Sequence, residues 1–118
     1  MATISRSTTA LTTHGSVGSV ATWSGMARGD DGAPIGDPGR TWMTIQVDGT
    51  IASGDLVQIQ GSNDGTNWYV LLDAEGAPVE FANVGLRQCN RSSLYVRPFI
   101  TGSGATADVT VTLVSVRG

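Results

Sequence analysis

Apolar and polar residues alternate along three segments of the chain, 43–48, 57–60 and 108–113. An alternation with a period of two places the apolar side chains on one face of an extended strand and the polar side chains on the other. The sequence therefore predicts three strands that each bury one face against a core. The apolar positions are Met43, Ile45, Val47, Val57, Ile59, Val109, Val111 and Leu113.

The segment 61–68, with the sequence GSNDGTNW, has the composition of a tight chain reversal. Gly and Asn adopt the positive φ that tight turns need, and Asn and Asp side chains bond the local backbone. We expect a β-hairpin here. The residues at 68–72 are all apolar or aromatic, which predicts a return strand covered on both faces.

The run 93–101 is also rich in β-branched and aromatic residues and predicts another strand. Pro98 lies inside it. Because proline has no N–H to donate to a ladder, we expect this strand to lie at a sheet edge or to carry a bulge. An open edge is a place where another chain can add as a further strand.

No segment sustains the spacing of an amphipathic helix, and the strand-like runs are separated by Gly, Asp and Asn turns. We therefore expect an all-β fold, an antiparallel β-sandwich of jelly-roll or immunoglobulin-like type, since both types produce such alternating runs. Residues 17–118 are expected to form its single domain. The Ser- and Thr-rich residues 1–16 are expected as a flexible, extended N-terminal arm, and the Gly-, Asp- and Pro-rich residues 28–40 as a surface loop.

The charge of the chain argues against two classes of partner. The formal net charge is −3, lysine is absent, and the seven arginines are scattered among acids. Proteins that bind nucleic acid or anionic membranes normally present a concentrated basic surface, so we expect neither partner. The N-terminus lacks the form of a signal peptide, and no segment has the length of a membrane span. We expect a protein made and kept in a soluble compartment.

Residue types that carry catalysis are few and poorly placed. His14 is the only histidine, and it lies in the expected arm, where nothing would hold it within reach of a nucleophile. Glu75 and Glu80 flank a turn sequence, the usual setting of surface acids rather than of a glycosidase pair. Cys89 has no second cysteine to pair with and is expected to be buried as a small apolar residue. We expect no enzymatic activity and no cofactor.

Three acids in the 28–40 segment, Asp30, Asp31 and Asp37, are candidate oxygen ligands for calcium. No EF-hand spacing surrounds them, and an Asp-rich turn is ordinarily only a turn, so we expect no metal site. Two tripeptides, Arg-Gly-Asp at 28–30 and Asn-Arg-Ser at 90–92, match an integrin-binding and a glycosylation motif. Such short matches arise by chance, and without an export signal we assign neither a role.

The three tryptophans, Trp23, Trp42 and Trp68, are candidates for stacking on a sugar ring. By alternation, Trp42 falls on the opposite face of its strand from the apolar positions of segment 43–48. An aromatic residue at the start of a strand more often covers the core or contacts another subunit. Trp42 is therefore our candidate for a partner contact, with sugar binding by the tryptophans as the alternative.

The segment VQIQGSNDGTNW at 57–68, followed by Leu71, resembles a pattern found in small β-sandwich structural proteins of tailed bacteriophages, capsid decoration (cement) proteins among them. The Ser- and Thr-rich N-terminus, the closing Val/Thr strand and the lack of lysine and catalytic residues add to the resemblance, which covers most of the chain after Gln46. The hairpin also resembles the turn of discoidin-type sandwich modules, which bind glycans or lipids. Those modules are usually longer, and the extracellular ones carry a terminal disulfide that a chain with one cysteine cannot form.

The resemblance to decoration proteins implies a non-enzymatic virion protein, made in the host cytoplasm, that docks on the outer capsid surface as a homotrimer and bridges neighbouring subunits of the major capsid protein. On this interpretation the arm lies extended on the shell, because Thr and Ile suit addition of a strand to a capsid edge. The alternatives are a tail, fibre or baseplate component, and a discoidin-like carbohydrate-binding module that uses Trp42 or Trp68. The expected partner-binding residues are Ala2, Thr3, Ile4, Ser5, Arg6 and Trp42.

Overall fold

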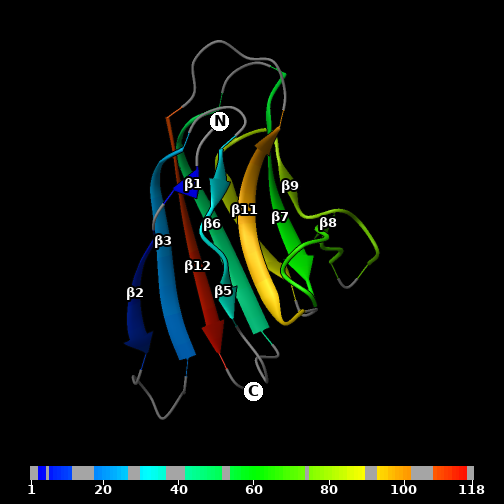
Figure 1. The fold of residues 1–118 in the computed structure, drawn as a ribbon. Coiled ribbons are helices and arrows are strands. Elements are labelled where there is room, and N and C mark those ends of the chain that lie inside the picture. Colours follow the sequence, from blue (N-terminus) through cyan, green and yellow to red (C-terminus); the bar gives the residue numbers. More distant parts are fainter. Residues whose placement is uncertain are drawn as a thin grey trace.

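Two β-sheets pack face to face and enclose one apolar core, as the computed structural model shows (Figure 1). The structure describes residues 3–4, 6–11, 18–26, 30–36, 42–51, 54–73, 75–89, 93–101 and 108–116. Within these ranges every regular element is a strand, and all pairings but one are antiparallel. The predicted all-β sandwich is confirmed.

One layer is a five-stranded antiparallel sheet in which the chain's longest strands lie side by side. Its central strand, β12, pairs with β6 along nine residues and with β3 on the other side, with one irregularity between Val109 and Val111. The order across the sheet is β10 (Gly85–Cys89), β6 (Trp42–Thr50), β12 (Asp108–Val116), β3 (Gly18–Met26) and β2 (Arg6–Leu11).

The other layer is a seven-stranded sheet built around two longer strands, β7 (Leu56–Ser62) and β11 (Tyr95–Thr101), which pair along their whole length. Short strands flank them on both sides. On the β11 side lie β4 (Asp31–Gly32), β5 (Ile35–Gly36) and β1 (Thr3–Ile4), which pairs parallel with β4; on the β7 side lie β8 (Tyr69–Val70) and β9 (Glu80–Phe81).

The core lies between the two sheets and takes its side chains from the inward positions of the longer strands. All eight apolar positions of the three alternating segments are at most 1% exposed, which confirms those predicted strands. Burial of such side chains stabilises the fold by roughly 1.5–3 kcal/mol for each large one. The remaining buried apolar residues are Ala21, Trp23, Met26, Ile35, Val79, Phe81, Cys89, Val96 and Ile100.

The expectation of a surface loop at 28–40 is wrong for residues 30–36, which enter the seven-stranded sheet as β4 and β5. Ile35 belongs to the core, and the indole Nε1 of Trp23 donates a hydrogen bond to the carbonyl of Ala33 at 3.0 Å. Gly32 is buried because it has no side chain: a Cβ there would lie 2.6 Å from atoms of Pro98 and Trp23. Backbone pairing and close packing thus outweigh the polar, turn-like composition. Residues 28–29 and 37–40 lie outside the described ranges.

The N-terminal arm is extended where the structure describes it, but it is paired with the protein's own strands instead of free. Arg6–Leu11 is β2, which pairs residue by residue with β3, and Thr3–Ile4 is β1, which pairs with β4. Ile4 packs against the core. The β-branched residues that suggested strand addition to a partner instead add strands to the protein's own sheets, since the edges of β3 and β4 accept them. Ala2, Ser5 and residues 12–16, His14 among them, lie outside the described ranges.

Of the two predictions about the hairpin and its return strand, one is confirmed and the other is wrong. Tyr69 and Val70 pair with Gly61 and Gln60, so the hairpin is confirmed. The two-sided burial of the return strand is wrong, because Tyr69 is 73% exposed. Its strand pairs with β7 over two residues only and lies at the margin of the seven-stranded sheet.

Pro98 does not mark a sheet edge, because β11 has neighbours on both sides. On one side Pro98 pairs with Ile59, and on the other it faces the interval between the β4 and β5 pairings, which involve Phe99 and Val96. A residue without an N–H fits inside a sheet where the neighbouring ladder is interrupted. The edge prediction therefore failed because the interruption is in the partner strands.

Candidate functional site

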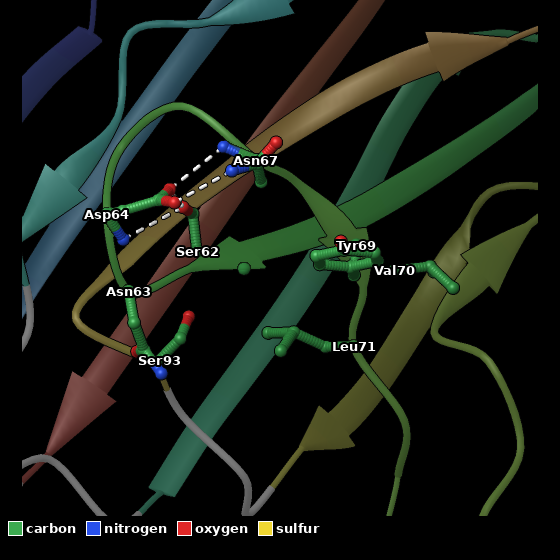
Figure 2. Close-up of a pocket in the computed structure, with 9 residues that line it drawn as sticks. Ser62, Asn63, Asp64, Asn67, Tyr69, Val70, Leu71 and Ser93 are labelled. Atoms are coloured by element: carbon green, nitrogen blue, oxygen red, sulfur yellow. Dashed lines mark hydrogen bonds between the residues drawn. The ribbon is translucent and has the colours of Figure 1, made fainter.

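The hairpin turn is held by the carboxylate of Asp64. Its Oδ1 accepts hydrogen bonds from the backbone N–H groups of Thr66 and Asn67 and from the hydroxyl of Ser62, each at 2.8 Å, and its Oδ2 accepts one from Asn67 Nδ2 at 2.8 Å. Figure 2 shows Ser62, Asp64 and Asn67 side by side in the turn. These bonds, the one from the Asn67 backbone first, hold the pKa of Asp64 well below its usual range. Gly65 supplies the positive φ, +77°. The turn is therefore a rigid, ionised projection beside the sheet.

A shallow pocket of about 390 Å³ lies beneath this turn (Figure 2). Gly61 lines the pocket, and a Cβ at this position would collide with the Ser93 hydroxyl and the Leu71 side chain. The Asn63 side chain accepts a hydrogen bond from the Leu94 backbone at 2.9 Å and so ties the turn to the chain before β11. Most polar groups that line the pocket are bonded within the turn or to the chain before β11. The pocket therefore results from the shape of the hairpin and is not our candidate binding site. The residues that line it are Gly61, Ser62, Asn63, Asp64, Asn67, Tyr69, Val70, Leu71 and Ser93.

A continuous row of hydrogen-bonded polar side chains crosses the outer face of the seven-stranded sheet; we call it the cross-sheet ladder. It runs over β1, β4, β11, β7 and β9. Its bonds are Thr3 Oγ1 to Asp31 Oδ1 (2.7 Å), Arg97 Nη1 to Asp31 Oδ2 (2.8 Å), Arg97 Nε to Gln60 Oε1 (2.9 Å), Gln60 Nε2 to Gln58 Oε1 (3.2 Å) and Gln58 Nε2 to Glu80 Oε2 (2.6 Å).

Aromatic rings flank the arginine of this ladder. The guanidinium carbon of Arg97 lies 4.2 Å from the centroid of the Trp68 ring and 5.9 Å from that of Phe99, within the range of cation–π attraction. Partial burial lowers the pKa of Arg97, and the carboxylate of Asp31 opposes that change. The guanidinium stays charged because its pKa lies far above neutrality. Rings and ladder together hold Arg97 in one orientation.

The outer face of the five-stranded sheet has a different character. Its described side chains are mostly hydroxyl, amide or aliphatic. The two acids among them, Asp48 and Asp108, lie toward one end, where Asp48 is opposite Thr110 and its Oδ2 accepts a hydrogen bond from Gln46 Nε2 at 2.6 Å. Leu86 on the edge strand β10 is 64% exposed. We call this surface the uncharged face; its described members are Val20, Thr22, Thr44, Gln46, Leu86, Gln88, Thr110, Thr112 and Val114.

The expected partner-binding residues are not brought together in one described patch. The hydroxyl of Thr3 enters the cross-sheet ladder, while Ile4 packs on the core. Arg6 and Trp42 begin β2 and β6, but their side chains lie outside the described part of the chain.

The candidate catalytic and metal residues are dispersed as well. Cys89 is buried in the core, as predicted, and its Sγ lies 3.4 Å from the carbonyl oxygen of Leu72. Glu80 belongs to the ladder, whereas Glu75 is exposed in a turn. The carboxylate of Asp31 forms an ion pair with Arg97 and accepts a hydrogen bond from the Thr3 hydroxyl. Among the residues with described positions, no group of three His, Cys, Asp or Glu side chains is arranged to hold a metal ion.

Sequence reasoning missed the residues of the ladder. The alternation around 57–60 correctly turned Gln58 and Gln60 away from the core. The alternation of apolar and polar residues could not show that β11 would place Arg97 opposite Gln60, because that pairing joins segments 37 residues apart. The acid Asp31 comes from a segment that was expected to be a loop.

The described fold is that of a small antiparallel β-sandwich with two broad outer faces. One is the uncharged face, and the other carries the cross-sheet ladder and its aromatic rings. No protein-family model and no curated protein matches the chain significantly. Among solved structures it is similar to the SPBc2 prophage-derived protein YomS, with a TM-score of 0.47 and 11% identity over 82% of this chain and 92% of that one. This similarity is too distant to assign a function. The described ranges contain strands and no helix, and hence no helix that could span a membrane.

Proposed function

We propose that this chain is a non-enzymatic virion structural protein that binds the outer surface of a phage capsid and reinforces contacts between neighbouring major capsid protein subunits. The observation that carries the proposal is the uncharged face. Charged residues are depleted from the centres of protein interfaces, because each buried charge must be desolvated or paired. A broad sheet face whose two described acids, Asp48 and Asp108, lie toward one end suits a protein surface better than open solvent.

The size of this face fits a stable contact. Three strands of this sheet have nine residues each, β2 has six and β10 has five. With about 3.4 Å per residue and about 4.8 Å between strands, one face of the five-stranded sheet covers about 600 Å². A standard protein interface buries about 800 Å² on each partner. Threonine and valine side chains also present a flat, stiff surface that loses little conformational entropy on binding.

The hairpin pattern at 57–68 supports a phage protein of the decoration type through its resemblance to that family. In the proposed assembly the protein binds as a homotrimer, so that three linked contacts on one shell raise the avidity above that of any single contact. Since Thr3 and Ile4 take part in the protein's own fold, the proposed shell contact is the uncharged face instead of a free arm. Trp42 begins one of the strands of that face.

The test is co-sedimentation with undecorated phage heads, combined with light scattering of the free protein. The wild type is expected to be a trimer and to sediment with heads at a fixed stoichiometry. Thr112→Arg, in the central strand of the uncharged face, should weaken binding about tenfold or more, because the new charge is buried without a partner. Thr66→Arg in the exposed hairpin turn is the matched control and should bind as the wild type does.

Two results would speak against this assignment. Unchanged binding by Thr112→Arg would exclude the uncharged face as the shell contact. A wild-type protein that ignores heads but sediments with isolated tails would move the assignment to a tail, fibre or baseplate component.

A further inference from the structure

We infer that the outer face of the seven-stranded sheet is a binding site for a neutral glycan chain, formed by the cross-sheet ladder together with Trp68 and Phe99. The inference starts from two open hydrogen-bonding positions. Within the described residues, Arg97 Nη2 has no acceptor and Glu80 Oε1 has no donor, although the other polar atoms of both side chains are bonded into the ladder. A donor and an acceptor are therefore held in fixed orientation at the surface.

The chemistry of the ladder matches hydroxyl groups. A sugar hydroxyl both donates and accepts a hydrogen bond, and planar carboxylate, amide and guanidinium groups offer both functions. Ligand sites typically combine a few fixed polar groups with aromatic surface. Because each ladder residue is already held by its neighbours, little side-chain freedom is lost when a ligand binds. This preorganisation distinguishes the ladder from an ordinary polar sheet face, where long side chains move independently.

The aromatic rings supply the apolar part of the site. Trp68 and Phe99 are both half-buried and lie beside Arg97. Stacking on Arg97 fixes the Trp68 ring while part of its surface stays exposed. The C–H face of a pyranose packs against such a ring while the hydroxyls at its rim remain free for polar partners. Rings and polar groups therefore lie within reach of one ligand.

Charge and length define the class of glycan. Arg97 is neutralised by its ion pair with Asp31 at 2.8 Å, and Glu80 adds a negative charge. An anionic ligand such as a phosphorylated or sulfated polymer would be repelled, whereas a neutral ligand would not. The ladder crosses five adjacent strands, a span of about 19 Å at about 4.8 Å between neighbouring strands. That length fits an oligosaccharide segment better than a single sugar.

The test uses native gels cast with one polysaccharide each: a β-glucan, an α-glucan, a galactomannan and a xylan as neutral probes, and polygalacturonate as the acidic probe. The wild type should be retarded by at least one neutral probe and not by polygalacturonate. Trp68→Ala should weaken that binding about tenfold, since an aromatic contact is lost. Tyr69→Ala is the matched control, because Tyr69 is the next residue, is 73% exposed and lines the hairpin pocket instead of the ladder.

A second variant keeps the test valid if Trp68→Ala does not fold. Glu80→Gln is isosteric and preserves the bond to Gln58 through its carbonyl oxygen, but it replaces the open acceptor by a donor, so binding should fall about tenfold. Circular dichroism and thermal unfolding verify the fold of each variant. Equal mobility of the wild type in all neutral gels, or retardation that both variants retain, would overturn the inference. Loss of binding in Tyr69→Ala alone would place the site in the pocket and also overturn it.

The inference does not depend on the proposed capsid role. Thr112→Arg, on the opposite sheet, should leave polysaccharide retardation unchanged while it weakens binding to heads. The two proposals therefore fail separately. Glycan binding that disappears in Thr112→Arg would contradict a site on the seven-stranded sheet.

Discussion

Gly32→Ala is expected to destabilise the protein strongly, although it adds a single methyl group. The added Cβ would lie 2.6 Å from the Cδ and Cγ atoms of Pro98 and from the Nε1 atom of Trp23. These are ring atoms, and the indole is also fixed by its 3.0 Å hydrogen bond to the Ala33 carbonyl. Overpacking of a rigid core site costs about 1–3 kcal/mol, and lengthening the indole hydrogen bond adds about 1 kcal/mol. The expected loss in the free energy of unfolding is thus about 2–4 kcal/mol.

Urea denaturation followed by intrinsic fluorescence measures this loss, and thermal unfolding should show a Tm lower by about 10 °C. The control is Gly85→Ala in β10, where a Cβ would meet nothing within 4 Å. That variant should stay within about 0.5 kcal/mol of the wild type. If the two variants unfold at the same urea concentration, the close packing of β4 against Trp23 and Pro98 is refuted, and with it the placement of residues 30–36 in the sheet.

Two further predictions concern titration and reactivity. The hydrogen bonds in the hairpin lower the pKa of Asp64 below its unfolded value, so its contribution to stability is present above about pH 4 and is lost as the pH falls further; Asp64→Asn should therefore flatten the dependence of Tm on pH between about 2 and 4. Cys89 is buried in the core, so a thiol reagent should label it about 100-fold more slowly in the native protein than in denaturant. Equal rates would show that the thiol is accessible.

Local patterns predicted the elements whose burial follows from alternation. Met43, Ile45 and Val47 point inward because a strand with a period of two has one apolar face, whichever sheet it joins. The turn around Asp64 was predictable for the same reason, since Asn, Asp and Gly dictate the conformation through bonds to their own backbone. Predictions of strands and turns from such local patterns were confirmed, whereas the two-sided burial expected of residues 68–72 depends on distant residues and was wrong.

The failures share one physical cause. The 28–40 segment and the N-terminal residues were interpreted from composition, but whether Gly32 or Thr3 belongs to a sheet depends on a free strand edge supplied by distant residues. Pro98 was expected at a sheet edge or a bulge, although an interruption in the neighbouring strands accommodates it equally well. Strand pairing joins segments far apart in the chain, and composition carries little information about which segments meet.

The sequence by itself therefore determined the all-β class, the inward positions of the long strands and the hairpin turn, because these follow from side-chain period and local backbone chemistry. Only the tertiary structure decided which outward residues become neighbours. Pairing of β4, β11, β7 and β9 joins Asp31, Arg97, Gln58 and Glu80 into one row, and the five-stranded sheet gathers uncharged residues from separate strands into one face. Both candidate surfaces consist of residues distant in sequence, and long-range register alone brings such residues together.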